Sequence, residues 1–348
     1  MGISKSLGRW LLVLTVLTLL VLFENCSAPS GTAPTPTPNS SATVTVLSDQ
    51  ALPSDPHLTD YYIPSNATSA IVFLHGGGGS KEGLAFNLGI KNDNTTSDYA
   101  ASTSGETWLI ANQVMAVFPQ GQSVSGNNFT WTNLVMISGV DDVAFLQNLA
   151  SSIKFHYPNI TKIYLAGHSN GGMMANRIWC QSPTTFDAYV SFAGPPSPHL
   201  SPSTGDAPCA PTTIKPYLVA VGDHDKVLQT TGKMSDTAWT IDPALTTTSA
   251  AWVDATPTVL NELIFQPTRV NIACGGSVGS PVTSGQLTLY SSCSGTIQLV
   301  VVAQQNIGGV LQGGDHCINT IGFPCVATLP GAYTFDPKTL AFDFLKNY

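Results

Sequence analysis

The chain has 348 residues, of which 43% are hydrophobic and only 10% are charged, and its formal net charge is −8. This composition supplies a core for one large domain or two small ones, and it excludes a disordered, solvating chain. The acidic balance and the lack of a basic patch in the sequence exclude nucleic acid as an expected partner.

The N-terminus predicts export. Lys5 and Arg9 precede an apolar run at 10–23, which is shorter than the ~20 residues of a comfortable membrane span. This pattern is typical of a secretion signal, and we assign residues 1–28 to a signal peptide cleaved after Ala28. Two alternatives stay open: Cys26 as the lipidated first residue of a lipoprotein, or a retained anchor.

We therefore expect a secreted, extracellular protein with no membrane span in its mature form. The alternative location is the cell surface, held by a lipid anchor at Cys26. Residues 29–42 are rich in Pro, Ser and Thr and lack apolar periodicity, which predicts a linker that does not pack.

Strands and helices alternate through the remaining residues, 43–348. Continuous apolar runs that end near glycine are typical of buried parallel strands, and apolar residues at helical spacing predict the helices between them. This alternation predicts a mostly parallel central sheet with helices on both faces, in a single domain. The expected strands are 42–47, 60–64, 70–76, 114–121, 162–169, 188–194, 217–225 and 296–304, and the expected helices are 140–157, 170–180 and 339–347.

A serine stands where one of these strands meets a helix. Ser169 lies in "GHSNG", between Gly167 and Gly171, and matches the G-x-S-x-G nucleophile elbow of α/β-hydrolases. Side chains at the two glycine positions would collide with the neighbouring helix and strand. The alternative is a tight turn without chemistry, but the strand before and the helix after favour a nucleophile.

A serine nucleophile of this type is followed along the chain by its acid and then by its histidine. Of the seven histidines, only His199, His224 and His316 follow Ser169. His316 lies in the glycine-rich "GGDHC" loop after the last predicted strand, so we predict it as the general base. The side chain of His168, next to the serine, is expected to point away from the hydroxyl.

The acid should orient the base and stabilise its imidazolium form. Asp225 and Asp223 both follow the predicted strand in "YLVAVGDHD", and we favour Asp225 because its position gives the longer reach. The alternative for either aspartate is a turn or helix-capping residue, and Asp315 is expected to cap its own loop.

The oxyanion of the tetrahedral intermediate needs backbone N–H donors. We expect one from Asn170, which starts the helix after the serine. The other should come from "LHGGGGS", at Gly77, because glycine lets the backbone approach a substrate carbonyl closely. The same loop is not a phosphate-binding P-loop, because Lys81 follows Ser80 and not a glycine.

The cysteines agree with an oxidising compartment. Removal of Cys26 leaves an even number, as a disulfide framework requires. The order suggests three local pairs, although six cysteines allow fifteen connectivities. Zinc is a weak alternative because no CxxC or His-rich spacing occurs, and we expect no metal and no cofactor. The suggested pairs are Cys180 with Cys209, Cys274 with Cys293, and Cys317 with Cys325.

The segments "LHGGGGS", "VFPQG", "DDVAFLQNL", "IYLAGHSNGGMMANRIWC", "FAG", "GDHD" and "GGDHC" resemble the secreted polyhydroxybutyrate depolymerase and feruloyl esterase group of α/β-hydrolases. The resemblance extends over 57–348 in the family's order. It implies an α/β-hydrolase fold with Ser169, Asp225 and His316 as the catalytic triad, and Gly77 with Asn170 as the oxyanion hole.

The resemblance also implies a serine esterase that acts on polyester or on feruloyl and aryl esters, so the expected partner is an ester substrate, polymeric or small. The segment 230–257 is longer than the family pattern, which leaves the identity of the substrate open. Two alternatives to an esterase remain: a non-catalytic surface-binding protein on a hydrolase scaffold, and a serine peptidase or thioesterase.

Overall fold

The computed structural model describes residues 42–95, 97, 99–123, 128–133, 139–194, 209, 211–222, 280–303, 305–307, 310–312, 314, 316 and 336–348. These residues fall within one compact unit, Pro38–Tyr348. Among the described residues, its helices are α2 Lys81–Asn87, α3 Thr103–Asn112, α4 Asp142–His156, α5 Asn170–Gln181 and α10 Pro337–Leu345, with a 3-10 turn at Cys293–Gly295. Its strands are β1 Val44–Ala51, β2 Leu58–Pro64, β3 Ser69–Leu74, β4 Val114–Pro119, β5 Gln122–Ser123, β6 Phe129–Thr130, β7 Lys162–His168, β8 Ala188–Phe192, β9 Tyr217–Gly222, β10 Val282–Ser284, β11 Leu287–Ser292, β12 Ile297–Val302, β13 Gln305–Ile307 and β14 Val310–Gln312.

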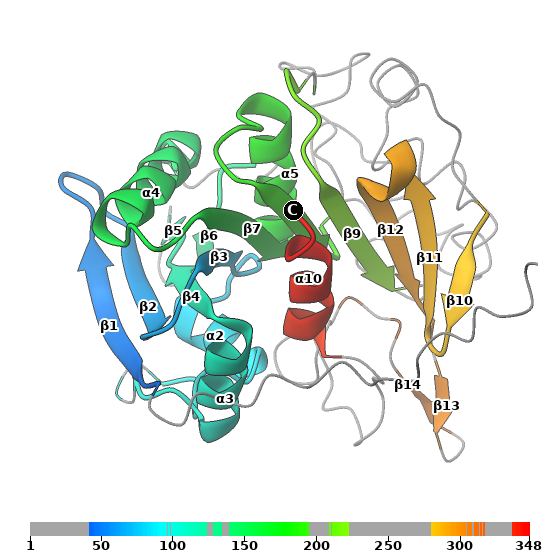
Figure 1. Cartoon of the computed structure of the whole chain (residues 1–348), viewed down its shortest axis with the longest axis horizontal. Coiled ribbons are helices and arrows are strands. Elements are labelled where there is room, and N and C mark those ends of the chain that lie inside the picture. Colours follow the sequence, from blue (N-terminus) through cyan, green and yellow to red (C-terminus); the bar gives the residue numbers. More distant parts are fainter. Residues whose placement is uncertain are drawn as a thin grey trace, which may run out of the picture. The chain divides into compact units, whose positions relative to one another are not determined.

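A ten-stranded sheet forms the centre of this unit, in the order β1-β2-β4-β3-β7-β8-β9-β12-β11-β10 (Figure 1). The central strands β4, β3, β7, β8, β9 and β12 run parallel to one another. The strands β1 and β2 are antiparallel at one edge, and β11 and β10 are antiparallel at the other. The predicted strands and helices therefore lie where the alternation places them.

The structure adds elements that the apolar runs do not predict. The strands β10 and β11 lie at the sheet edge, where Val282 is exposed and Leu287 is only half-buried, so the continuous apolar run of a central strand is missing. Two short helices, α2 and α3, follow the glycine loop and are capped by Ser80 and Ser102. His316 follows two further short strands, β13 and β14, which pair with each other.

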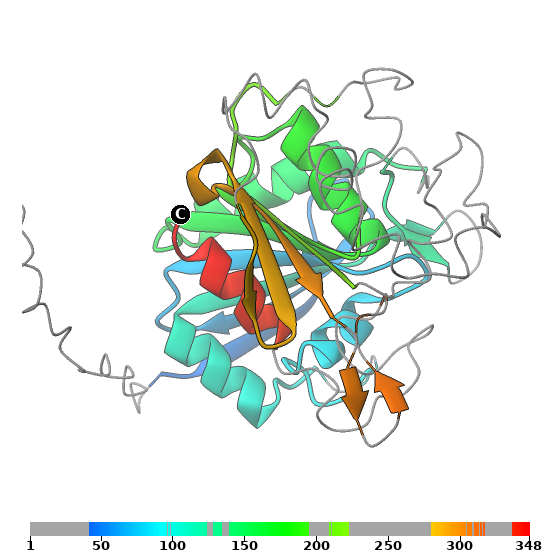
Figure 2. The ribbon, with the colours of Figure 1, turned by 90° about the vertical axis from the view of Figure 1, so that its right-hand side faces the viewer.

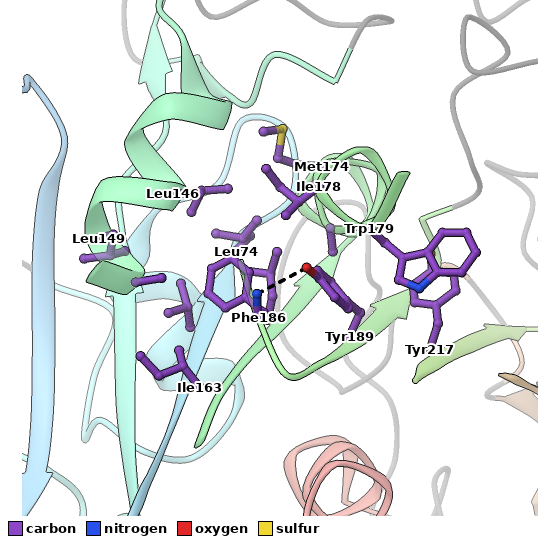
Figure 3. Packing of buried hydrophobic residues seen from close by; sticks show 14 of the residues in the cluster. Leu74, Leu146, Leu149, Ile163, Met174, Ile178, Trp179, Phe186, Tyr189 and Tyr217 are labelled. Carbon is purple, nitrogen blue, oxygen red and sulfur yellow. Dashed lines mark hydrogen bonds between the residues drawn. The ribbon is translucent and has the colours of Figure 1, made fainter. Parts of the chain in front are cut away.

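Alternate residues of each strand face opposite sides of the sheet and build two cores. In β3, Val72 and Leu74 join the cluster formed with α4 and α5, whereas Ile71 and Phe73 join the cluster formed with α2, α3 and α10. The sheet is thus covered by helices on both faces, as predicted (Figure 2). Figure 3 shows members of the first cluster: Leu74, Leu146, Leu149, Ile163, Met174, Ile178, Trp179, Phe186, Tyr189 and Tyr217.

One of the three suggested disulfides is described. Cys180, in the last turns of α5, bonds to Cys209 across a sequence separation of 29, with their Cα atoms 4.6 Å apart. This pair is confirmed. Cys293 is also disulfide-bonded, and its partner lies outside the described residues, as do Cys274, Cys317 and Cys325.

A buried histidine fastens the start of α4 to the sheet. The His57 ring has its Nδ1 2.5 Å from Asp55 and its Nε2 2.7 Å from Asp142, and it stacks on Phe145 at 3.8 Å between centroids. Asp142 is fully buried and also accepts a hydrogen bond from the backbone of Thr132 at 2.6 Å. The contact therefore joins the residues before β2 to the segment from Thr132 to Phe145, which is distant in sequence.

We predict that His57→Leu lowers the free energy of unfolding by about 3 kcal/mol, because it removes the His57 partner of the buried Asp142 carboxylate. Urea unfolding measures this loss. His156→Leu is the control, since His156 is exposed at the end of the same helix and its replacement should change stability little. Equal effects of the two variants would contradict the role given to His57.

Candidate active site

The backbone of Ser169 is strained. Ser169 has φ 51° and ψ −119°, in a region that residues with a side chain rarely adopt and that costs on the order of 1–3 kcal/mol. It stands between the last residue of β7 and the first residue of α5. Its N–H donates to the carbonyl of Phe192 at 2.8 Å, and its own carbonyl accepts from Met173 at 2.9 Å. These bonds hold the turn from both sides.

Glycines make this turn possible. A Cβ atom added to Gly167 would lie 2.2 Å from the carbonyl oxygen of Gly171, and one added to Gly171 would lie 2.4 Å from that of Leu74. Both approaches are far too close for a side chain. The structure thus gives the glycines of "GHSNG" the packing role expected from the sequence, with α5 pressed against β7 and β3.

His316 lies within hydrogen-bonding distance of the serine. Its Nε2 is 2.8 Å from the Ser169 hydroxyl oxygen, although 147 positions separate the two residues. His316 is 7% exposed. The structure therefore brings the predicted nucleophile and base together in the geometry that proton transfer requires. Asp225 and its rival Asp223 lie outside the described residues, so the acid stays a prediction.

The predicted oxyanion loop lies against the elbow. The parallel register of β3 and β7 pairs Leu74 with Gly167, so the loops after these strands start side by side. A Cβ on Gly76 would be 3.3 Å from the Cβ of Ser169. Gly77 follows Gly76 directly in this loop, and its role as an oxyanion donor stays a prediction.

His75 fixes the direction of the peptide between Gly76 and Gly77. The carbonyl of Gly76 accepts from His75 Nδ1 at 2.7 Å and from the Gly79 N–H at 3.0 Å. Because C=O and N–H point to opposite sides of a trans peptide, the Gly77 N–H is directed away from His75. This role of His75 was not predicted from the sequence, although its position between a buried strand and four glycines indicated a residue near the site.

The His75 ring is held in one neutral form. Its Nε2 accepts from the Gly121 N–H at 2.9 Å and lies 2.8 Å from Gln120 Nε2, so the ring proton belongs on Nδ1. Burial lowers the pKa of His75 from 6.5 to about 4. The imidazole is therefore neutral at neutral pH and donates to Gly76.

Asn170 occupies the first position of α5. A backbone N–H at this position has no acceptor within its own helix, which suits the predicted oxyanion donor. Its side chain has a separate role, because it accepts from the Trp131 N–H at 2.7 Å and donates to the Trp131 carbonyl at 3.1 Å. The Trp131 indole in turn donates to the His75 carbonyl at 3.0 Å. The elbow and the glycine loop are thus linked through Trp131.

A buried lysine directly after the glycine loop is surrounded by carboxylates. Lys81 is 3% exposed and its ammonium lies 2.8 Å from Asp60, 2.6 Å from Glu82 and 3.0 Å from Asp49. Burial alone would lower the pKa of Lys81, but the hydrogen bonds with Asp60 and Glu82 hold it above its usual value. Lys81 is the first residue of α2, so its ion pairs with these carboxylates fix the start of that helix.

The described part of the chain contains neither a cluster of metal ligands nor a membrane-spanning helix. No group of three or more His, Cys, Asp or Glu side chains there could hold a metal ion. No helix there is long and apolar enough to cross a membrane.

The comparisons with known proteins come from solved structures. No protein-family model matches the chain, and no curated protein matches it. The chain is similar to acetyl xylan esterase from Aspergillus awamori, with a TM-score of 0.52 and 13% identity over 87% of this chain and 99% of that chain. It is also similar to carboxylesterase from Mesorhizobium loti, with a TM-score of 0.36 and 15% identity over 52% of this chain and 77% of that chain.

The fold is that of an α/β-hydrolase. At 13% identity, the likeness to the acetyl xylan esterase is one of fold, and it agrees with the parallel sheet, its helical layers and the elbow after β7. The predicted fold class is confirmed. The narrower resemblance to polyhydroxybutyrate depolymerases and feruloyl esterases stays a prediction.

We predict that His75 makes folding stability fall in acid. Since the pKa of His75 drops from 6.5 to about 4 on folding, the unfolded chain binds more protons between these values. The contribution of His75 to the free energy of unfolding is fully present above about pH 6.5, and it is lost as the pH falls towards 4. His75→Asn keeps a donor for Gly76 but cannot titrate. The free energy of unfolding of the wild type, relative to that of His75→Asn, should therefore decrease by up to about 3 kcal/mol between about pH 6.5 and pH 4.

Urea unfolding of both proteins across this pH range measures the difference. His156→Asn replaces an exposed histidine and serves as the control for the loss of an imidazole at the surface. A His75→Asn difference that stays constant with pH would show that His75 is protonated equally in the folded and unfolded chains.

Proposed function

We propose that the chain is a serine carboxylic ester hydrolase that works through an acyl-enzyme. The observation that carries this proposal is the 2.8 Å contact between His316 Nε2 and Ser169 Oγ at a strained strand–helix elbow. A serine hydroxyl is a weak nucleophile until an adjacent base accepts its proton. The backbone strain at Ser169 and the glycine loop beside it are the features expected of such a site.

Acylation follows from this geometry. His316 accepts the hydroxyl proton while Ser169 Oγ forms a bond to the ester carbonyl carbon, and the carbonyl oxygen becomes an oxyanion. The N–H groups of Gly77 and Asn170 stabilise this charge. The imidazolium then donates this proton to the alkoxy oxygen of the ester, the ester C–O bond breaks, and the alcohol leaves.

Deacylation repeats the sequence with water. His316 takes a proton from water, the resulting hydroxide adds to the acyl carbon, and the oxyanion forms in the same place. The proton passes to Ser169 Oγ as its bond to the acyl group breaks, and the carboxylic acid leaves. Asp225 is the proposed acid, which would hold the His316 tautomer and stabilise its imidazolium in both halves.

The proposed substrates are polyhydroxyalkanoate-type polyesters or oligomers, or feruloyl and aryl esters. The support is the sequence resemblance over 57–348, and the length of 230–257 leaves the choice between these classes to experiment. The acetyl xylan esterase with the similar fold adds acetylated xylan to the substrates worth testing.

We also propose that the protein is secreted, with a lipid anchor at Cys26 as the alternative. The charged and apolar pattern of residues 1–28 supports export. The bond between Cys180 and Cys209 agrees with an oxidising compartment, where structural disulfides persist.

We expect Ser169→Ala to reduce turnover of p-nitrophenyl butyrate by roughly 10³-fold or more, because no hydroxyl remains to form the acyl-enzyme. The thermal midpoint should stay nearly unchanged. Ser182→Ala, at the far end of α5, is the matched control and should keep full activity.

A Ser169→Ala protein with wild-type turnover would contradict the proposal. No turnover of any ester by the wild type would favour the non-catalytic alternative, and faster cleavage of amides or thioesters would favour a peptidase or thioesterase. Comparison of hydroxybutyrate oligomers, methyl ferulate and acetylated xylan then decides the substrate class.

A further inference from the structure

The histidine just before the serine contacts the backbone of the base. His168 is the last residue of β7, and its Nε2 lies 2.8 Å from the main-chain carbonyl oxygen of His316. A carbonyl oxygen only accepts, so His168 Nε2 carries the hydrogen and donates it. The two imidazole rings have centroids 5.2 Å apart and planes inclined by 49°, so they lie close together without stacking.

The other edge of the His168 ring lies against the glycine loop. A Cβ atom on Gly76 would come within 3.2 Å of His168 Nδ1, which is tighter than ordinary van der Waals contact. The ring therefore fills the space between the glycine loop and the backbone of His316. The expectation that His168 points away from the serine hydroxyl agrees with this position, but the sequence did not indicate the contact with His316.

Two consecutive residues of the elbow thus hold His316 at two different points. Ser169 contacts its imidazole, and His168 contacts its main-chain carbonyl. Only the first contact is altered by the reaction. Once Ser169 Oγ is esterified it has no hydrogen to donate to Nε2, whereas the bond from His168 is untouched.

We propose that His168 is a positioning residue that keeps the backbone of His316 in place while Ser169 is acylated. This inference rests on the proposed function. The predicted acid would orient the imidazole ring through Nδ1, whereas His168 fixes the main chain from which the ring projects. Deacylation depends on His316 at the moment when its contact with the Ser169 hydroxyl is absent, so the hydrolysis of the acyl-enzyme is the step most sensitive to His168.

The test compares two replacements of His168. His168→Gln retains an amide donor near the position of Nε2, whereas His168→Met has a similar reach and no donor. With a p-nitrophenyl ester, we expect His168→Met to lower kcat about 10- to 100-fold, because a small misplacement of a catalytic group costs rates of this order.

A positioning role predicts that kcat changes much more than kcat/KM. When deacylation becomes slow, KM falls together with kcat, so kcat/KM should change by less than about threefold, and one equivalent of p-nitrophenol should appear in a burst. His168→Gln should restore kcat. A merely structural role would instead lower kcat/KM and the thermal midpoint in both variants, and that result would overturn the inference, as would wild-type kinetics in His168→Met.

A second measurement does not depend on ester turnover. In Ser169→Ala the hydroxyl is absent, so the His316 imidazole signals in a ¹H–¹⁵N spectrum report its position without that contact. These signals should stay single and narrow in Ser169→Ala and in Ser169→Ala with His168→Gln, but broaden or split with His168→Met. Narrow, unchanged signals in all three would refute the positioning role, whereas absent wild-type turnover would refute the proposed function alone.

Discussion

The backbone of Ser169 is the constraint on which the site depends. A positive φ at a serine is unfavourable, and it persists because the residues on both sides belong to elements that are packed and hydrogen-bonded. Gly167 and Gly171 let α5 approach β7 and β3 to distances that no side chain would permit. The hydroxyl is thereby held at the end of a central strand, where His316 reaches it.

Backbone groups around this serine are held by polar side chains that are buried or, for His168, half-buried. His75 orients the carbonyl of Gly76, Asn170 pairs with the backbone of Trp131, and His168 contacts the carbonyl of His316. The chain carries few charges, yet it buries Lys81 among carboxylates directly after the glycine loop. Because buried polar groups are costly when unpaired, these contacts specify one arrangement of the loops.

Local patterns predicted much of the fold and part of the site. The apolar runs gave the central strands, and the spacing of Gly167, Ser169 and Gly171 gave the elbow, because both depend on neighbouring residues. The order of the triad residues along the chain predicted His316. The closeness of Cys180 and Cys209 in the sequence predicted the disulfide between them. The strands β10 and β11 were missed because they lack the continuous apolar run of a central strand.

Contacts between distant segments could not be predicted in the same way. His57 meets Asp142 across 85 positions, and His168 meets the backbone of His316 across 148. Neither pair has a local motif, since each depends on which loops the parallel strands bring to the same edge of the sheet. The assignment of Asp225 rests on chain order and resemblance, and it stays a prediction.

Direct observation of the acyl-enzyme tests the central claim, that Ser169 is the nucleophile. The protein would be mixed with a p-nitrophenyl ester, quenched in acid during turnover, digested and analysed by mass spectrometry. The account predicts that the mass of the acyl group is added to the peptide containing Ser169, at that residue, and that His316→Ala greatly slows its appearance. Acylation of another residue during turnover, or rapid turnover in the Ser169→Ala protein through an adduct elsewhere, would contradict it.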